Sequence, residues 1–134
     1  MKKRILFLCT GNAARSQMAE ALARANHGDV VDVVSAGSRP AGFVHPQAIR
    51  AMADLGVDIR DAESKSAERF INEKFDAVVT VCDSAAQDCP VWPGARRLEH
   101  WSIDDPSSGG YPAFVATRDD LARRIAELVA SLED

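Results

Sequence analysis

The sequence of 134 residues is the length of one ordinary domain, so we expect a single domain over residues 1–134. Apolar residues make up 46% and charged residues 27%, which excludes a disordered chain, and the lack of any apolar run near ~18 residues excludes a membrane span. The formal net charge of −4, with no basic tract longer than Lys2-Lys3-Arg4, excludes nucleic acid as a partner.

Hydrophobic periodicity predicts alternating strands and helices. The apolar run in Lys3–Leu8 is typical of a strand buried on both faces, and Asp76–Cys82 (DAVVTVC) has the same pattern. This alternation predicts an α/β sandwich with a mostly parallel sheet, in which ligands bind beyond the carboxyl ends of the strands. In chain order we expect a strand at 3–8, a helix at 16–27, a strand at 30–35, helices at 46–55 and 66–73, strands at 76–82 and 95–101, and an amphipathic helix at 112–132.

The amino-terminal segment and the cysteines bear on the location of the protein. The apolar run Ile5–Cys9 is shorter than the ~7–15 residues of a secretory signal core, so a first strand explains it better and we expect a cytoplasmic protein. The chain has three cysteines, Cys9, Cys82 and Cys89, an odd number that does not suggest a secreted disulfide framework. In a reducing cytosol such thiols are catalytic, metal-binding or simply buried.

A loop of small residues, within Cys9–Ser16 (CTGNAARS), follows the first strand. A Cys and an Arg separated by five residues are a weak signal alone, but here a strand precedes them and a helix follows. The backbone N–H groups of such a loop can curl toward one centre, and the helix adds its positive end, so we expect the loop to bind a tetrahedral oxyanion. The oxyanion-binding residues would be Thr10, Gly11, Asn12, Ala13, Ala14 and Arg15.

The side chains of this loop suggest a nucleophile. The guanidinium of Arg15 matches a tetrahedral oxyanion, and together with the loop amides it favours the thiolate of Cys9 near neutral pH. Ser16, at the helix start, is expected to donate a hydrogen bond to the sulfur and to cap the helix. Asn12 is expected to brace the loop or to adopt a left-handed conformation. The alternative is a buried cysteine that ends a strand, beside a surface arginine.

The two later cysteines, Cys82 and Cys89, are separated by six small or polar residues. This spacing is neither the CxxC of a thioredoxin-like motif nor that of a structural zinc knuckle, and a zinc site that included His100 would lack a fourth ligand. If the segment is a helical turn, the two sulfurs start apart, so a disulfide between them requires a mobile loop. Two unrelated cysteines are the alternative.

A candidate acid follows the fourth predicted strand, in Asp104-Asp105-Pro106. A nucleophile that attacks an oxyanion must expel an oxygen, and a positioned carboxylic acid makes this easier by protonating it. Pro106 restrains Asp105 to an extended conformation, which suits an aimed side chain. The alternative is a plain Asp-Pro turn.

Taken together, the chain resembles the thioredoxin-coupled arsenate reductases of the low-molecular-weight tyrosine-phosphatase fold over nearly its whole length. The resemblance rests on CTGNAARSQMAE at 9–20, SAG at 35–37, VCDSAAQDCPVWPG at 81–94 and HWSIDDP at 100–106. It implies a three-layer sandwich with a four-stranded parallel sheet, and the reduction of arsenate to arsenite. By position it makes Cys9 the nucleophile, Arg15 the oxyanion clamp, Asn12 and Ser16 the groups that tune Cys9, Asp105 the general acid, and Cys82 and Cys89 the resolving pair.

This resemblance also implies partners. Arsenate would bind the loop, with phosphate or sulfate as analogues, and the three cysteines would pass a disulfide outward to thioredoxin. No cofactor would be bound, because the reducing equivalents come from thioredoxin, supplied by NADPH through thioredoxin reductase. A small thiol is the alternative reductant.

Two departures from the family pattern matter. Family members often have Ser and Cys where this chain has Ala13 and Ala14, so a local disulfide within the loop is ruled out. Some of these reductases bind potassium behind the loop, with groups that correspond to Asn12, Glu20, Ser35 and an acidic residue near position 65. Because position 65 is Lys65 here, its ammonium would repel or replace the ion, and we predict no metal site.

Two other functions remain open. A low-molecular-weight tyrosine phosphatase would use Cys9, Arg15 and Asp105 through a phosphocysteine and would need no other cysteine. Similar phosphatases often place an aromatic ring after the Asp-Pro pair, where this chain has Ser107. The third possibility is an anion-binding regulatory module without turnover.

Overall fold

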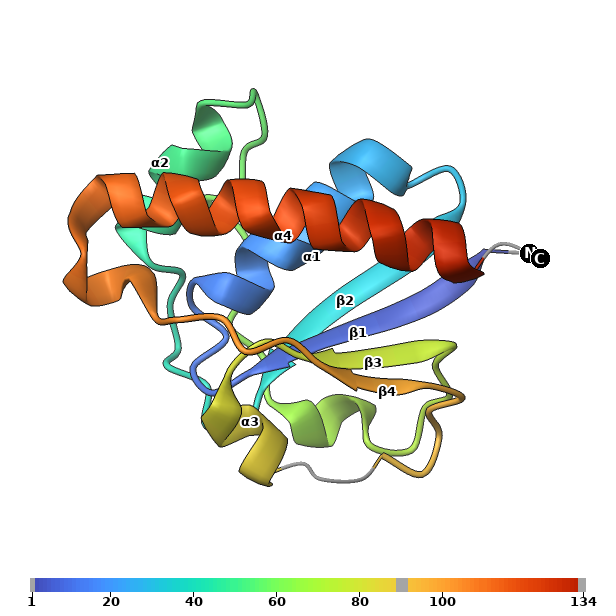
Figure 1. The fold of residues 1–134 in the computed structure, drawn as a ribbon. Helices are drawn as coiled ribbons and strands as arrows, with labels where there is room; N and C mark the ends of the chain where they lie inside the picture. The colour runs from blue at the N-terminus through green and yellow to red at the C-terminus, as the bar shows by residue number, and fades with distance from the viewer. Residues whose placement is uncertain (1, 89–91, 133–134) are drawn as a thin grey trace.

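The structure is a computed structural model and describes residues 2–88 and 92–132. Strands and helices alternate along the chain (Figure 1), and two of the helices, η1 and η2, are short 3-10 turns. The elements are β1 (Lys3–Cys9), α1 (Arg15–His27), β2 (Val31–Gly37), α2 (Pro46–Ala53), η1 (Ala67–Phe70), β3 (Ala77–Thr80), α3 (Asp83–Asp88), β4 (Leu98–His100), η2 (Pro106–Ser108) and α4 (Gly110–Leu132).

The four strands form one sheet in the order β2-β1-β3-β4, and every pairing between them is parallel. Strand β1 is central, with Ile5 opposite Val33 on one side and Ala77 on the other. The side chains from Ile5 to Leu8 are fully buried, as a strand covered on both faces requires. The predicted four-stranded sheet is confirmed and is wholly parallel, so the carboxyl ends of all its strands lie at one edge.

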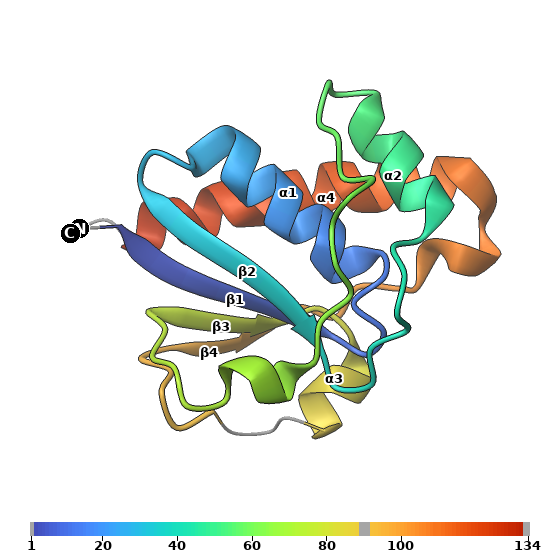
Figure 2. The same cartoon turned by 180° about the vertical axis from the view of Figure 1, so that it is seen from behind.

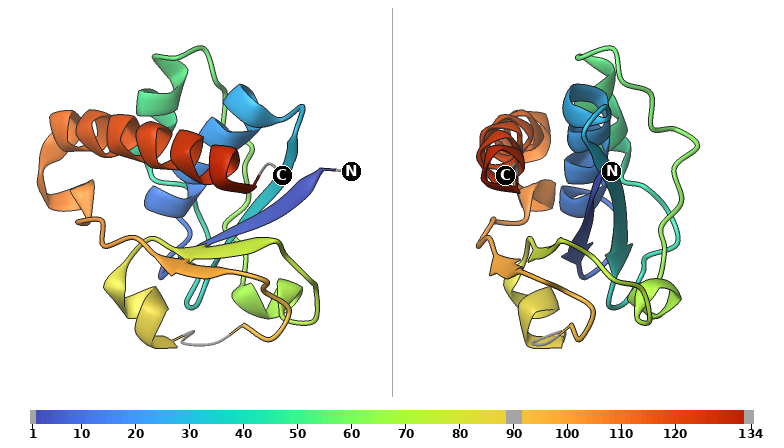
Figure 3. Two further views of the ribbon diagram at one scale, coloured as in Figure 1. Left: turned by 45° about the vertical axis from the view of Figure 1, so that its right-hand side comes forward. Right: turned by 90° about the vertical axis from the view of Figure 1, so that its right-hand side faces the viewer.

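Helices cover both faces of this sheet (Figures 1 and 2). Helices α1 and α4 pack against each other on one face, with α2 beside them, whereas η1 and α3 lie on the other side (Figure 3). Helix α4 buries Phe114, Leu121, Ile125 and Leu128, which confirms the predicted amphipathic closing helix. The three-layer sandwich is therefore present. Nowhere in the described ranges does a helix have the length and apolar character needed to cross a bilayer.

Several bounds differ from the prediction. Strands β3 and β4 are shorter than the apolar runs at 76–82 and 95–101, because their pairing covers only Val78–Thr80 against Leu98–His100. The helix expected at 66–73 is the short turn η1, which Ser66 begins by accepting a hydrogen bond from the Glu68 amide. The short helix η2 was not predicted, and a helical turn between Cys82 and Cys89, where α3 lies, was only considered, since neither is long enough to repeat an apolar pattern.

Gly37, at the end of β2, allows that strand to lie directly against the loop that follows β1. A Cβ atom at Gly37 would lie 2.5 Å from the carbonyl oxygen of Thr10 and 3.0 Å from the amide nitrogen of Asn12. Any larger residue would have to displace the loop backbone. The SAG motif at 35–37 therefore supports the loop from behind.

Candidate active site

The loop between β1 and α1 lies at the carboxyl edge of the central strand, where parallel α/β sheets bind ligands. Its carbonyl oxygens point outward and accept hydrogen bonds from a neighbouring segment: Thr10 from the amide of Arg39, Gly11 from Ala41 and Ala13 from His45. The amide of Asn12, in the loop, donates to Cys9 Sγ at 3.2 Å, and the amide of Ser16, in the first helical turn, also faces this sulfur. That the loop amides bind an oxyanion stays a prediction.

Ser16 makes the closest polar contact to the sulfur of Cys9. The Oγ of Ser16 lies 2.7 Å from Cys9 Sγ and accepts a hydrogen bond from Asn12 Nδ2 at 2.8 Å. Because the Ser16 oxygen acts as the acceptor for Asn12, the proton of the Ser16 hydroxyl is free to be donated to the sulfur. The predicted contact is present, but the predicted capping role is wrong: α1 begins at Arg15, its N-cap is Ala14, and no side chain caps it.

The protonation of Cys9 differs from the prediction. Burial raises the pKa of the Cys9 thiol above its ordinary value, while hydrogen bonds from the Ser16 hydroxyl and from the amides of Ser16 and Asn12 act in the opposite direction. The guanidinium of Arg15 is aimed elsewhere, since its Nη1 donates to the carbonyl oxygen of Ile103 at 2.9 Å. The thiolate expected near neutral pH is therefore not supported, because the sequence showed the donors of the loop but not the desolvation of the sulfur.

Asn12 holds the loop in shape. Its backbone is left-handed, with φ of 49°, as predicted, and its side chain is fully buried. Besides the bond to Ser16, Asn12 Nδ2 donates to Ser35 Oγ at 2.9 Å, and Asn12 Oδ1 accepts from Gln17 Nε2 and from the amide of Lys65. Every polar group of this side chain is thus used to fix the loop.

Asn12, Ser35 and Glu20 are linked behind the loop, where Lys65 joins them. The hydroxyl of Ser35 donates to Glu20 Oε1 at 2.7 Å, and the ammonium of Lys65 lies 3.5 Å from the same oxygen. Arg24 contacts the other oxygen of Glu20 at 3.1 Å. The charge of the nearly buried Glu20 carboxylate is thus balanced by two side chains of the protein. Among the described residues, no three His, Cys, Asp or Glu side chains gather as a metal site.

Cys82 follows β3 at the same edge of the sheet and is buried. Its sulfur lies 3.3 Å from the hydroxyl of Thr10, the residue next to Cys9. The two thiols are also close enough for Cys82 to raise the pKa of Cys9. The topology therefore brings together two cysteines that are 73 residues apart in the chain. Cys89, the third predicted cysteine, lies outside the described residues.

Asp105 begins η2, where its Oδ1 accepts a hydrogen bond from the amide of Ser107 at 2.9 Å. Partial burial opposes ionisation of this carboxyl, but the hydrogen bonds from Ser107 and the charges of Arg15 and His45 lower its pKa below the ordinary value. The turn-forming alternative is thus present in the structure. The bond from Arg15 to Ile103 ties the loop of Cys9 to the segment that carries Asp105.

The sequence analysis missed the contacts of two side chains in this site, Gln17 and Thr10. Gln17 is almost fully buried and donates both to Asn12 and to the carbonyl oxygen of Glu63 at 2.8 Å. The sequence feature that could have indicated this role is a polar residue on the buried face of α1, directly after Ser16. Thr10 was assigned to the oxyanion only through its backbone, and no sequence pattern connected its hydroxyl with Cys82.

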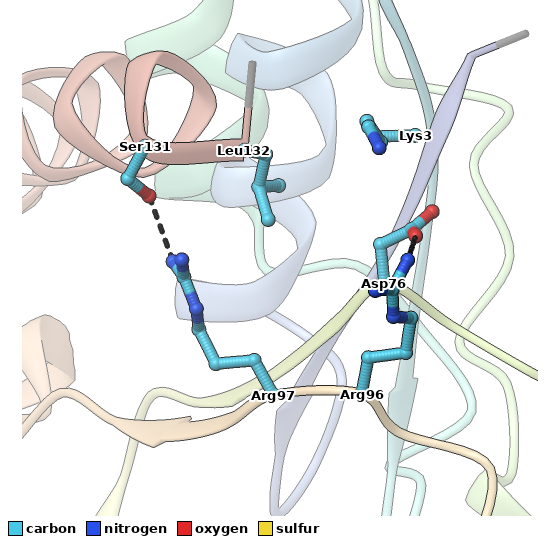
Figure 4. Close-up of a pocket in the computed structure, with 6 residues that line it drawn as sticks. All are labelled: Lys3, Asp76, Arg96, Arg97, Ser131 and Leu132. Atoms are coloured by element: carbon cyan, nitrogen blue, oxygen red, sulfur yellow. Dashed lines mark hydrogen bonds and ion pairs between the residues drawn. The ribbon is translucent and has the colours of Figure 1, made fainter. Parts of the chain in front are cut away.

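A separate pocket lies at the opposite, amino-terminal edge of the sheet (Figure 4). It is bordered by Lys3, Asp76, Arg96, Arg97, Ser131 and Leu132, with Arg97 bonded to Ser131 at 2.7 Å and Arg96 paired with Asp76 at 3.7 Å. None of the predicted site residues borders this pocket.

Residues 4–134 match the low molecular weight phosphotyrosine protein phosphatase family, and the chain belongs to this family. Its relatives include proteins named arsenate reductase: one from Brevibacillus brevis is 42% identical over 98% of each chain, and one from Bacillus cereus is 44% identical over 92% of each. A solved arsenate reductase in the phosphate binding state superposes with a TM-score of 0.88 at 31% identity, over 99% of this chain and 100% of that chain. The YwlE arginine phosphatase from Geobacillus stearothermophilus has a TM-score of 0.80 at 27% identity, over 97% of this chain and 92% of that chain.

Proposed function

We propose that the protein reduces arsenate to arsenite, with Cys9 as the nucleophile and Cys82 as the second thiol. The observation that carries the proposal is the pair of buried thiols at one sheet edge, with Ser16 2.7 Å from Cys9 Sγ and Thr10 3.3 Å from Cys82 Sγ. The names of relatives at 42% and 44% identity support the same reaction. Arsenate would bind the amides of the loop, and phosphate or sulfate would compete with it.

In the first step, the sulfur of Cys9 forms a bond to arsenic and one arsenate oxygen leaves as water. Cys9 starts as a thiol, so its proton passes to the bound oxyanion as the bond forms. The guanidinium of Arg15 can exchange the carbonyl of Ile103 for the oxyanion, with which it forms a stronger, charge-assisted pair. Asp105 supplies a proton to the leaving oxygen, after the approach of the anion favours its protonated form.

In the second step, the sulfur of Cys82 attacks that of Cys9. The sulfur–arsenic bond breaks, its electron pair stays on arsenic, and arsenite leaves while a Cys9–Cys82 disulfide remains. Cys89 then attacks Cys82 and releases Cys9, which carries the disulfide away from the buried loop. A dithiol such as thioredoxin reduces the Cys82–Cys89 disulfide, and NADPH supplies its electrons through thioredoxin reductase. The net reaction turns arsenate and one dithiol into arsenite, one disulfide and water.

A phosphatase is the second candidate function. The loop of Cys9, with Arg15 and Asp105, contains what a phosphocysteine mechanism requires, and a structural neighbour is an arginine phosphatase. That mechanism gives no role to a second buried thiol beside the nucleophile. The position of Cys82 therefore favours the reductase.

The test is arsenate-dependent oxidation of NADPH by the protein with thioredoxin and thioredoxin reductase, beside hydrolysis of an aryl phosphate. We expect sustained NADPH oxidation by the wild type and none by Cys9→Ser or Cys82→Ser. Aryl phosphate hydrolysis that survives Cys82→Ser, without arsenate reduction by the wild type, would establish the phosphatase instead. Loss of NADPH oxidation when glutathione and glutathione reductase replace thioredoxin and thioredoxin reductase would separate the two reductants.

A further inference from the structure

A chain of hydrogen bonds connects the carboxyl ends of β3 and β4 with the start of α3. The ring of His100, the last residue of β4, lies between two partners. Its Nδ1 is 2.8 Å from Thr80 Oγ1, and its Nε2 is 2.8 Å from Asp83 Oδ1. Ser102 adds a second donor, since its hydroxyl bonds the same oxygen of Asp83 at 3.1 Å. We call this set the His100 bridge.

The geometry determines which atoms donate. A carboxylate can only accept, so Nε2 of His100 carries a proton and donates to Asp83. The hydrogen bonds from His100 and Ser102 lower the pKa of Asp83 below its ordinary value, so this carboxyl is ionised at neutral pH. The bridge is therefore charge-assisted on the side that reaches α3.

The His100 bridge ends one residue after Cys82. On the other side of Cys82, the amide of Val81 bonds the carbonyl oxygen of Leu8 at 2.8 Å, which fixes the chain to β1. Cys82 thus lies between two anchored neighbours, one fixed by the sheet and the other by the bridge. The sulfur of Cys82 itself contacts the hydroxyl of Thr10.

We propose that His100 is a positioning residue, which holds Cys82 beside Cys9 through its bond to Asp83. The proposal rests on the proposed function for the step it serves, the attack of Cys82 on Cys9. Without the bridge the first turn of α3 loses its attachment to β3 and β4, so Cys82 spends less time at the distance and angle that the attack requires. None of the hydrogen bonds that shape the oxyanion loop includes His100, so His100→Ala should leave anion binding as it is. Asp83 differs, because the charge of Arg15 also lowers its pKa, so loss of the Asp83 charge changes the field at the guanidinium that would bind the anion.

The first arm of the test needs no arsenate. In a Cys9→Ser, Cys89→Ser background, Cys82 is the single thiol, and its alkylation by iodoacetamide reports how often this buried sulfur becomes exposed. His100→Ala and Asp83→Asn should each raise the alkylation rate by roughly three- to tenfold, the effect of losing one charge-assisted bond at a partly exposed site. His100→Gln keeps an N–H donor toward Asp83, so its alkylation rate should lie between that of these two variants and that of the parent protein with His100.

Asp58→Asn is the matched control for this arm, because Asp58 is an exposed carboxylate paired with Arg60 at 2.9 Å on another segment. It should leave the alkylation rate unchanged. If His100→Ala does not fold, as circular dichroism would show, Asp83→Asn and His100→Gln still test the bridge. Equal alkylation rates in Asp83→Asn and in the wild type would overturn the proposal.

The second arm measures one turnover. With all three cysteines present, His100→Ala and Asp83→Asn should release arsenite more slowly by a similar factor. The inhibition constant of phosphate should stay at the wild-type value in His100→Ala, which keeps the charge of Asp83 near Arg15. A parallel loss of phosphate binding would overturn the positioning role and indicate a general structural one. If the single-thiol variants show the expected alkylation rates but the wild type releases no arsenite, the proposed function is refuted and the placement of Cys82 by His100 stays intact.

Discussion

The ammonium of Lys65 lies 3.5 Å from Oε1 of Glu20, the same oxygen that accepts the hydroxyl of Ser35. From Ser35 the hydrogen bonds continue through Asn12 to Ser16, and from Ser16 to the sulfur of Cys9. A covalently attached cation thus stands at one end of a buried network whose other end is the nucleophile.

Potassium should therefore have no specific effect on stability. The melting temperature of the wild type should be equal in potassium and sodium chloride at the same ionic strength, because the ammonium of Lys65 already occupies the side of Glu20 that faces Ser35. Differential scanning calorimetry in the two salts measures this. A rise in melting temperature that is specific to potassium would contradict the prediction that the Lys65 ammonium excludes the ion.

Removing the Lys65 charge should destabilise the fold. Lys65→Gln leaves Arg24 as the cation paired with the nearly buried Glu20 carboxylate, with Ser35 still donating to it, at a cost of about 1–3 kcal/mol in the free energy of unfolding. Lys74→Gln, at an exposed position, is the control and should change little. Urea denaturation of both variants provides the measurement, and equal midpoints would argue against the role of Lys65.

Ser16→Ala should raise the pKa of the Cys9 thiol further. The Ser16 hydroxyl is the strongest of the influences that oppose burial, and alanine cannot donate to the sulfur. Thiolate absorbance, followed against pH in a Cys82→Ser, Cys89→Ser background, gives the midpoint for Cys9. An unchanged midpoint in Ser16→Ala would show that the 2.7 Å contact does not tune the nucleophile.

Cys9 should also make the protein less stable at alkaline pH. Because burial raises the folded-state pKa of this thiol, its contribution is complete below the pKa of the unfolded chain and is lost as the pH rises through the folded value. Between pH ~8 and ~10 the wild type should lose more of its melting temperature than Cys9→Ser does. If the melting temperatures of the two proteins fall in parallel with pH, the pKa of the Cys9 thiol is not raised.

Asp105→Asn should slow arsenate turnover by roughly two to four orders of magnitude while arsenate still binds. The asparagine oxygen can still accept from the Ser107 amide, so the turn at η2 is kept and only the proton is lost. Asp104→Asn, at the exposed neighbouring position, is the matched control. Near-normal turnover by Asp105→Asn would leave Asp105 with a turn-forming role alone.

Cys89→Ser should reduce about one arsenate per enzyme and then stop, with Cys9 bridged to Cys82. The reason is access, since both of those sulfurs are buried and exchange requires in-line approach of a thiolate. Mass spectrometry of the stopped protein identifies the bridge, and Cys82→Ser should release little arsenite at all. Sustained turnover by Cys89→Ser with thioredoxin would show that the partner reaches the first disulfide directly.

The sequence predicted what depends on local pattern. The apolar run before Cys9 indicated a strand, which is present, and the small residues after it indicated a loop around the sulfur, where the amide of Asn12 donates to Cys9 Sγ. That the loop binds an oxyanion stays a prediction. The lysine at position 65 led us to predict no metal site, which stays a prediction, and the fold shows that its ammonium lies beside Glu20.

The features that were missed depend on contacts between distant segments. A buried cysteine that ends a strand was an alternative from the sequence, but that burial outweighs the hydrogen-bond donors and raises the pKa of Cys9 depends on the packing around the sulfur. Helix α3 is too short for periodicity to reveal it, and it is attached by His100, 17 residues beyond Asp83. Sequence patterns report neighbours along the chain, whereas these properties come from neighbours across the sheet.

The pocket in Figure 4 has a consequence for the engineering of this chain. Lys3, at the start of β1, and Leu132, at the end of α4, border the same hollow, at the sheet edge opposite the nucleophile. A short peptide linker can therefore join these two ends without crossing the reactive edge. A circular permutant cut at the turn around Gly56 would keep the parallel sheet, because Gly56 lies outside all four strands.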